Sequence, residues 1–235
     1  MLDARLRTAA DWVTPCGVCA DIGCDHGRLG TALLLEHRCQ HLLAADVSAK
    51  ALDKARARVR AQNLAECTTF VHADGLSALD ALPDGKADTV CILGMGGDTL
   101  SGILRRGQSR LQGAKLILGA QTELPAVREA IQRIGYRLQQ ERVVAVDQHL
   151  YLLMLALPAQ GDEPPYTAAE LALGPCLLHD MPAQWRPWLE RRERLLSGAV
   201  AAMQASGVPA TETRHAASAW ELAITRDALA KLADP

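Results

Sequence analysis

The sequence predicts an α/β fold, a mostly parallel sheet that ends in an antiparallel hairpin, followed by a helical region. Residues 17–35 read as an apolar strand, a Gly-containing turn and a helix. Further apolar segments then alternate with helical patterns up to residue 134, which is typical of strands joined by helical crossovers. Two long strand patterns meet tightly at Asp147, and so short a joint favours an antiparallel pair.

The composition supports a globular chain with a sizeable core. Of the 235 residues, 49% are hydrophobic and 22% charged, which excludes a disordered protein. Aromatic residues make up only 3%, so aliphatic side chains must build the core. The net charge of −2 gives no general attraction to nucleic acid or anionic membranes, and any such contact needs a local basic patch.

Cysteine usage and hydropathy indicate a cytoplasmic protein without a membrane span. Seven cysteines occur without an N-terminal apolar leader, which is typical of a reducing compartment. Cys16 and Cys19 lie three positions apart on a strand and so face opposite sides, which favours a structural role and no metal. The apolar run 150–157 is shorter than the roughly 18–20 residues that cross a bilayer.

The elements follow in order along the first two thirds of the chain. A helix is predicted within residues 1–14, ended by Pro15, with Arg5 and Arg7 on its polar side. Ser48 is a suitable N-cap for the helix that follows the second strand. We expect strands at 17–22, 41–47, 67–72, 87–93, 115–119, 136–146 and 148–157, and helices at 28–35, 49–61, 76–82, 98–105 and 123–134.

A linker separates this region from a helical one. Residues 158–167 are rich in proline, glycine and acidic residues. Helical patterns follow at 168–173, 182–205 and 212–232, and the middle one carries an amphipathic stripe that includes Leu189 and Leu195. We expect an αα-hairpin that turns near Gly207-Val208-Pro209. The predicted domains are residues 1–160 and 161–235.

Five βα units that finish in an antiparallel hairpin form the element pattern of a class I methyltransferase domain, a Rossmann-like fold with a seven-stranded sheet. The pattern alone does not exclude a dehydrogenase. The first turn discriminates between them, because Asp25 stands where a dinucleotide fold has the second glycine of Gly-x-Gly-x-x-Gly. A carboxylate beside a pyrophosphate costs roughly 4 kcal/mol at contact near a protein surface. The sequence therefore favours a ligand without phosphates.

Acidic residues end three successive strands of the predicted sheet. Asp21 and Asp25 belong to the first turn, Asp46 follows the second strand and Asp74 the third. The carboxyl ends of parallel strands line one ligand crevice. S-adenosylmethionine fits this crevice, since it carries a sulfonium and an ammonium and no phosphate. Asp46 is placed to accept the ribose hydroxyls, and Asp74 to accept the adenine amino group.

The fourth strand ends in Gly94-Met95-Gly96-Gly97, which offers bare backbone and no acid. Such a segment permits close approach of a flat base, and Met95 can pack against it.

With these motifs the chain resembles the bacterial tRNA (adenine-N1)-methyltransferases that modify adenosine 22. The similarity covers nearly the whole chain, including a C-terminal region like that family's coiled-coil domain. Its motifs are Ala20-Asp21-Ile22-Gly23-Cys24-Asp25-His26-Gly27, Asp74-Gly75-Leu76, Gly94-Met95-Gly96-Gly97, Leu116-Ile117-Leu118 with Arg128-Glu129, and Leu173-Gly174-Pro175.

The resemblance implies an S-adenosylmethionine-dependent enzyme that methylates N1 of adenosine 22 in tRNA. We expect the protein to be a monomer or weak dimer. The implied cofactor-binding residues are Asp21, Gly23, Asp25, Asp46, Val47, Asp74, Gly75 and Gly94. The implied substrate-binding residues are Met95, Gly96 and Gly97, with Arg5 and Arg7 available for the polyanion. Two segments depart from the family: Gly119-Ala120-Gln121 replaces Gln-Pro-Asn, and Asp46 stands where Glu is frequent.

Asp25 and His26 are the predicted catalytic residues. Adenine N1 has a free lone pair, so its attack on the methyl group needs no prior deprotonation. The product is cationic until N6 loses a proton, and a carboxylate such as Asp25 would stabilise that charge. His26 would orient the base or shuttle the proton.

Three alternatives stay open from the sequence. The first is a methyltransferase for a small molecule or a protein, and the second acts on another RNA position. The third is a non-catalytic module that binds S-adenosylmethionine or RNA.

Overall fold

The computed structural model describes residues 1–207, 209 and 212–233. The chain divides into two compact units, Met1–Pro165 and Tyr166–Pro235, whereas the boundary predicted from the sequence lies at 160/161. None of the helices within the described residues is long and apolar enough to cross a membrane.

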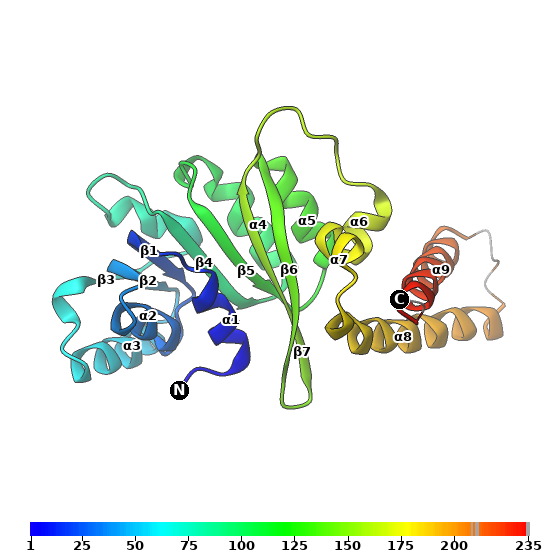
Figure 1. Ribbon diagram of the computed structural model, residues 1–235, viewed down its shortest axis with the longest axis horizontal. Helices are drawn as coiled ribbons and strands as arrows, with labels where there is room; N and C mark the ends of the chain where they lie inside the picture. Colours follow the sequence, from blue (N-terminus) through cyan, green and yellow to red (C-terminus); the bar gives the residue numbers. More distant parts are fainter. Residues whose placement is uncertain (208, 210–211, 234–235) are drawn as a thin grey trace. The chain divides into compact units, whose positions relative to one another are not determined.

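The first unit is built on a seven-stranded sheet (Figure 1) in the order β3-β2-β1-β4-β5-β7-β6. The five strands from β3 to β5 in this order run parallel, and β7 pairs antiparallel with both β5 and β6. The predicted fold class with its antiparallel terminal hairpin is therefore confirmed. The strands are β1 (Cys16–Ile22), β2 (Cys39–Asp46), β3 (Thr68–His72), β4 (Thr89–Met95), β5 (Lys115–Ala120), β6 (Tyr136–Val146) and β7 (His149–Pro158).

The helices of this unit begin and end close to their predicted limits. They are α1 (Ala4–Trp12), α2 (Arg28–Leu35), α3 (Ala49–Ala61), α4 (Gly97–Gly107) and α5 (Leu124–Arg133), with short 3₁₀ helices η1 (Ala65–Cys67), η2 (Gly75–Ala81) and η3 (Gln108–Arg110). The helix expected at 76–82 is thus the 3₁₀ helix η2. Ser48 caps α3 as predicted, since its hydroxyl accepts the amide of Ala51 at 3.3 Å.

The core lies on both faces of the central strands. Helix α2 contacts both α1 and α3, and η2, α4 and α5 form a second group (Figure 1). Both faces of β1, β4 and β5 are covered, which is why these strands read as continuous apolar runs. Leu33, Leu42, Ile92 and Leu118 are fully buried. Burial of such aliphatic side chains supplies the main favourable free energy of folding.

The second unit is helical throughout its described part. Its elements are α6 (Ala168–Leu173), α7 (Pro175–Asp180), the 3₁₀ turn η4 (Ala183–Trp185), α8 (Arg186–Ala205) and α9 (Thr213–Ala233). Helix α7 is missing from the sequence prediction, although Pro175 at its first position is a usual start signal.

Helices α8 and α9 pack antiparallel. Arg192 pairs with Glu221 between them, and Arg226 donates to Glu193 at 2.9 Å. The predicted turn includes Val208, which lies outside the described residues. Leu195 was expected in the packing stripe but is 67% exposed, because the contact face runs through Leu189, Arg192 and Val200.

Candidate active site

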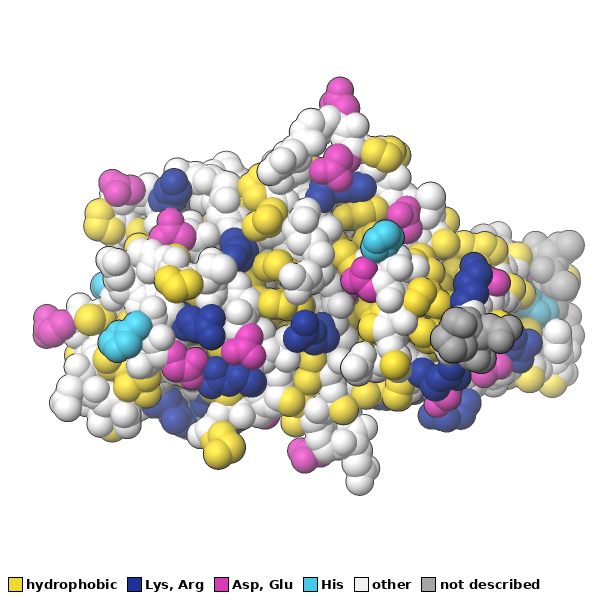
Figure 2. Space-filling view, viewed as in Figure 1, with side chains coloured by type: hydrophobic (Ala, Val, Ile, Leu, Met, Phe, Trp, Pro, Cys, Tyr) yellow, Lys and Arg dark blue, Asp and Glu magenta, His cyan; other side chains and the backbone are white. Residues whose placement is uncertain are grey.

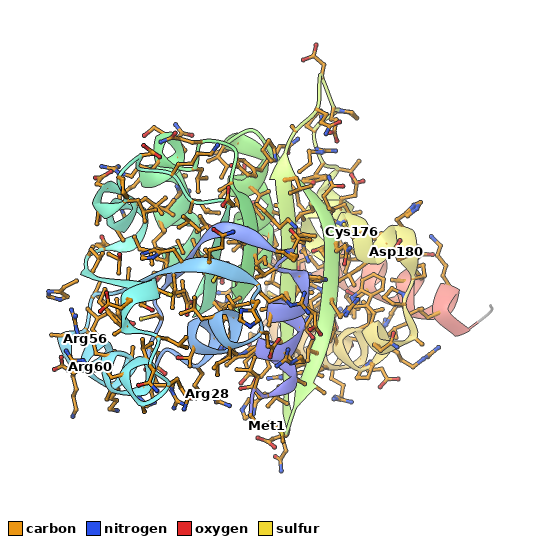
Figure 3. All side chains as sticks on the ribbon, turned by 60° about the vertical axis from the view of Figure 1, so that its left-hand side comes forward. Met1, Arg28, Arg56, Arg60, Cys176 and Asp180 are labelled. Atoms are coloured by element: carbon orange, nitrogen blue, oxygen red, sulfur yellow. The ribbon has the colours of Figure 1, made fainter. Side chains whose placement is uncertain are left out.

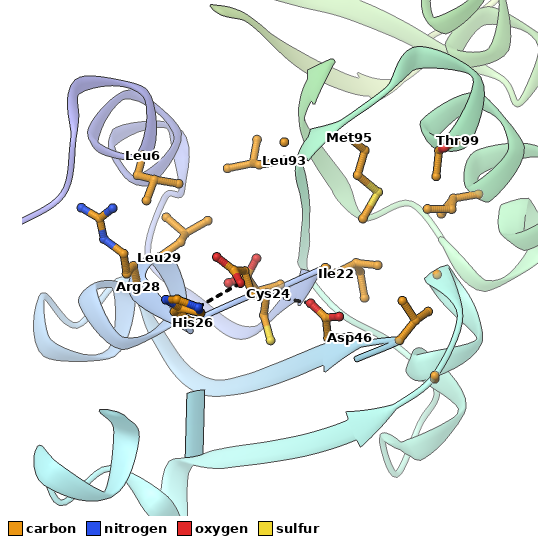
Figure 4. Close-up of a pocket in the computed structure, with 18 of the residues that line it drawn as sticks. Leu6, Ile22, Cys24, His26, Arg28, Leu29, Asp46, Leu93, Met95 and Thr99 are labelled. Carbon is orange, nitrogen blue, oxygen red and sulfur yellow. Dashed lines mark hydrogen bonds and ion pairs between the residues drawn. The ribbon is translucent and has the colours of Figure 1, made fainter. Parts of the chain in front are cut away.

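A cavity of about 420 Å³ opens at the carboxyl ends of the first four strands. Strand order reverses between β1 and β4, and ligands of open α/β sheets bind at this switch point. The volume lies within the roughly 300–1,000 Å³ typical of small-molecule sites. Its lining (Figure 4) is Arg5, Leu6, Asp21, Ile22, Gly23, Cys24, Asp25, His26, Arg28, Leu29, Asp46, Val47, Ala73, Asp74, Gly75, Leu93, Gly94, Met95, Thr99 and Ile103.

The turn after β1 forms the floor of the cavity and is fixed to the end of β2. Gly23 has φ +73°, a conformation that glycine adopts without strain. The amides of Gly23 and Cys24 donate to the carbonyl of Ala45 at 2.8 and 2.9 Å. Asp25 also has a positive φ of 47°, and its side chain is 75% exposed. The turn therefore presents the Asp25 carboxylate to solvent at the cavity mouth.

Asp46 organises the backbone around the cavity. Its Oδ2 accepts the amide of Asp25 at 3.0 Å, and its Oδ1 accepts the amide of Ser48 at 2.8 Å. Each carboxylate oxygen has a second lone pair. Asp46 can therefore hold the turn and accept two ligand hydroxyls as well.

Asp21 is the buried acid of the site, with 4% of its surface exposed. Burial raises the pKa of Asp21 to about 7, and the nearby charges of Asp46 and Asp25 act in the same direction. A hydrogen bond from the Gly30 backbone lowers the pKa of Asp21 but does not outweigh burial. A cation bound in the cavity would favour the ionised form.

This raised pKa predicts a pH dependence of stability. The folded protein holds the Asp21 proton between pH about 4 and 7, where the unfolded chain has lost it, so stability falls as pH rises through that window. We expect Asp21→Asn to remove this slope and to exceed the wild type in stability above pH 7 by at most about 4 kcal/mol. Urea unfolding at pH 5, 6, 7 and 8 measures it. Asp53→Asn, at an exposed position of α3 outside the cavity, is the matched control, and equal pH slopes for wild type and Asp21→Asn would contradict the prediction.

Asp74 follows β3 at the far end of the crevice. Its Oδ2 accepts from Arg106 of α4 at 3.2 Å, and the carboxyl group is 68% exposed. Oδ1 is left to accept from a ligand amino group. Gly75 lies beside it and packs against Ile103 of α4.

His26 sits among basic groups of α3. Its Nε2 lies 2.9 Å from Lys54 Nζ, and its carbonyl accepts from Arg58 Nε at 2.9 Å. Lysine can only donate, so Nε2 is the acceptor of this contact. The same nitrogen lies 3.4 Å from Asp25 Oδ1 and cannot donate to it while Lys54 holds it.

The residues after β4 separate into two pairs. Gly94 and Met95 line the cavity, whereas Gly96 and Gly97 lie outside its lining. Gly97 is buried, and a Cβ there would stand 2.2 Å from the carbonyl oxygen of Thr122. The requirement for glycine at 97 therefore comes from close packing of α4 on the loop after β5.

The two arginines of α1 also differ. Arg5 lines the cavity, and Arg7 does not. Arg7 instead donates to both carboxylate oxygens of Glu36, at 2.8 and 2.6 Å.

Several cavity residues have no counterpart in the sequence prediction. They are Leu6, Ile22, Cys24, Arg28, Leu29, Ala73, Leu93, Thr99 and Ile103. Thr99 and Ile103 lie four positions apart on one face of α4, which was the available signal, but only the packing of α4 beside β4 turns this face toward the cavity.

The acidic side chains of the cavity suit S-adenosylmethionine. Four carboxylates line the cavity, at Asp21, Asp25, Asp46 and Asp74, and such a set favours a cationic ligand with hydroxyl and amino donors. A pyrophosphate would be repelled by the same groups.

Comparisons with known proteins agree with this fold. A curated tRNA (adenine(22)-N(1))-methyltransferase of Bacillus subtilis (strain 168) is 29% identical over 162 residues, which cover 68% of this chain and 67% of that protein. The crystal structure of the B. subtilis M1A22 tRNA methyltransferase TrmK superposes with a TM-score of 0.86 at 24% identity, covering 97% of this chain and 99% of that one. M. capricolum TrmK, solved with S-adenosyl-homocysteine, superposes with a TM-score of 0.84 at 19% identity and covers 99% of both chains.

The family comparison matches the catalytic region of the chain. The family model described as "Methyltransferase domain" matches residues 2–154, which include every strand of the sheet up to the last residues of β7. The cavity at the switch point lies wholly within this match. The chain therefore belongs to the methyltransferase domain family.

Proposed function

We propose that this protein transfers the methyl group of S-adenosylmethionine to N1 of adenosine 22 in tRNA. The observation that carries the proposal is the acid-lined cavity at the switch point of a methyltransferase fold. The similarity to the curated B. subtilis enzyme, which extends over 162 residues, supports the choice of nucleoside and position.

The cofactor supplies an electrophilic methyl group on a sulfonium. Asp46 would accept the ribose hydroxyls while it holds the turn, and Asp74 would accept the adenine amino group through Oδ1, since its Oδ2 already accepts from Arg106. Gly94 and Met95 provide a bare edge where a flat base can approach. Adenosine 22 lies within folded tRNA, so its N1 becomes accessible only when the base is extracted or the fold is loosened.

Asp25 stabilises the developing positive charge on the adenine ring from the mouth of the cavity. We expect Asp25→Asn to lower kcat about 10-fold, less than for a water-excluded group because its side chain is 75% exposed. The affinity for S-adenosylhomocysteine should stay within about 3-fold, since the variant keeps the backbone contact to Asp46. Single-turnover methylation and calorimetry measure the two quantities.

Asp53→Asn is the matched control for this variant, because Asp53 is an exposed acid of α3 outside the cavity. A kcat for Asp25→Asn equal to that of the Asp53 control would remove Asp25 from the mechanism. His26 then remains as an orienting residue, in contact with Lys54.

Binding of tRNA needs a local basic surface, because acidic and basic side chains are interspersed over the face shown in Figure 2. Helix α3 offers one such surface, and Figure 3 shows Arg56 and Arg60 projecting from it. Lys50, Lys54 and Arg60 are exposed there. In the second unit, Arg191 and Arg194 are exposed on α8, and we assign this unit to tRNA contact as well.

Purified protein, labelled S-adenosylmethionine and unmodified tRNA test the proposal. The expected product is 1-methyladenosine mapped to position 22, absent from the same tRNA carrying guanosine at that position. Methylation at another nucleoside would show that adenosine 22 is not the target. Methylation of small molecules without salt-dependent affinity for RNA would show that tRNA is not the substrate. Cofactor binding without turnover on any tRNA would overturn the enzymatic proposal.

A further inference from the structure

Arg5 lies at the mouth of the cavity, where its guanidinium packs on an aromatic ring and has no acidic partner among the described residues. Its guanidinium lies 5.1 Å from the centroid of the Tyr151 ring on β7. Within the described part of the chain no carboxylate lies within ion-pair distance of it. The Tyr151 ring holds the cation in place and leaves its charge uncompensated. A partly buried guanidinium without an anionic partner can bind an anionic ligand group.

The other arginine of the cavity is already engaged. Arg28 donates to the carbonyl of Met1 at 2.9 Å, and it lies 3.5 Å from the carboxylate of Asp3. Arg5 is therefore the available cationic donor among the described residues that line the cavity.

The position of Arg5 along the crevice identifies the ligand group that it meets. The strand order β3-β2-β1-β4 places Asp74, Asp46, the turn around Gly23 and then Gly94 in sequence across the cavity. Arg5 Nη1 lies 3.1 Å from the site where a Cβ on Gly94 would stand. A ligand with its adenine at Asp74 and its ribose at Asp46 therefore extends its other end toward Gly94 and Arg5.

That other end of the proposed cofactor is an amino acid, whose carboxylate must avoid four aspartates. A carboxylate in contact with one of them would cost roughly 4 kcal/mol near the protein surface. Arg5 offers it a planar guanidinium that matches its geometry. The aspartates meanwhile suit the ammonium and the sulfonium.

We propose that Arg5, held on the Tyr151 ring, binds the α-carboxylate of S-adenosylmethionine and positions the methyl donor. This inference rests on the proposed function only for the identity of the cofactor. It reassigns Arg5 from tRNA contact to cofactor binding. Tyr151 is a positioning residue, because it acts through Arg5.

Two ligands that differ by one group test the proposal: S-adenosylhomocysteine and its decarboxylated analogue, titrated calorimetrically. We expect Arg5→Ala to weaken S-adenosylhomocysteine binding about 10- to 100-fold and to leave the affinity for the analogue within about 2-fold. Arg5→Lys should lose about 3- to 10-fold, since lysine keeps the charge without the bidentate geometry. Tyr151→Phe should bind as the wild type, and Tyr151→Leu should lose a few-fold for the carboxylated ligand alone.

Arg7→Ala is the matched control on the same helix, because Arg7 is paired with Glu36 and lies outside the cavity. It should change neither affinity. Equal losses for both ligands in Arg5→Ala would overturn the proposal and leave Arg5 a role in the shape of the cavity. If Arg5→Ala leaves the affinity for S-adenosylhomocysteine unchanged, raises the KM for tRNA and makes tRNA binding less dependent on salt, the proposal is also overturned. Arg5 would then bind an RNA phosphate.

The two proposals fail separately. If the wild type binds S-adenosylhomocysteine but methylates no tRNA, the proposed function fails while the pair of ligands still decides the role of Arg5.

Discussion

Replacing Asp46 by Ala is expected to weaken S-adenosylhomocysteine binding by roughly 100- to 10,000-fold. The substitution removes the acceptors proposed for two ribose hydroxyls, and each charge-assisted hydrogen bond contributes about 1.5–3 kcal/mol. It also leaves the amides of Asp25 and Ser48 without their side-chain acceptor, so the turn that forms the cavity floor loses one of its contacts to β2 and keeps those to the Ala45 carbonyl. Isothermal calorimetry on the purified variant measures the effect.

Asp46→Glu is the matched control, since it keeps the carboxylate on a chain one methylene longer. We expect it to bind within about 10-fold of the wild type. The 2′-deoxyribose form of the ligand separates the two contributions in the wild type, because it lacks one hydroxyl while the turn stays intact. An affinity of Asp46→Ala within 5-fold of the wild type would mean that the ribose is held elsewhere.

Replacing Arg128 by Met is expected to destabilise the first unit by about 3–5 kcal/mol. Arg128 of α5 and Glu141 of β6 are both fully buried, and Arg128 Nε and Nη2 each lie 2.9 Å from Glu141 Oε1. The variant would leave the Glu141 carboxylate buried without its cation, which costs far more than the pair gains when it is intact. Urea unfolding with comparison of the m-values measures the loss.

Two further variants identify the cause of this destabilisation. Arg128→Met combined with Glu141→Leu removes both charges and should recover most of the stability, because a hydrophobic pair of similar volume replaces them. Arg133→Met on the same helix breaks the exposed pair with Glu129 and should change stability by less than about 1 kcal/mol. A double variant as unstable as Arg128→Met would show that packing volume, not the orphaned charge, sets the effect.

The candidate site shows where local sequence information was sufficient. The acids Asp21, Asp25, Asp46 and Asp74 were assigned to one cavity from the sequence, and all four line it. The reason is topological: residues that end parallel strands must meet at one edge of the sheet. The sequence did not predict the raised pKa of Asp21, because that shift depends on burial. It also did not predict the ion-pair partner of Asp74, because Arg106 comes from a helix beyond the next strand.

Arg5 and Arg7 show the opposite case. Both lie on the polar side of one amphipathic helix, and the sequence treats them alike. Contacts from segments far along the chain make the two arginines different. Glu36 neutralises the charge of Arg7, whereas Arg5 lies against the Tyr151 ring, which leaves its charge in place. Gly97 is similar, since its proximity to Thr122 is a contact between the first turn of α4 and the loop after β5.

The sequence by itself determined the order of strands and helices, the antiparallel hairpin and the acidic crevice, because hydrophobic periodicity, turn residues and strand ends are local properties. Only the tertiary structure decided which charges stay unpaired, which glycines face the cavity and which acid is buried. These properties depend on residues that are distant in the chain and adjacent in space, and periodicity carries no information about such neighbours.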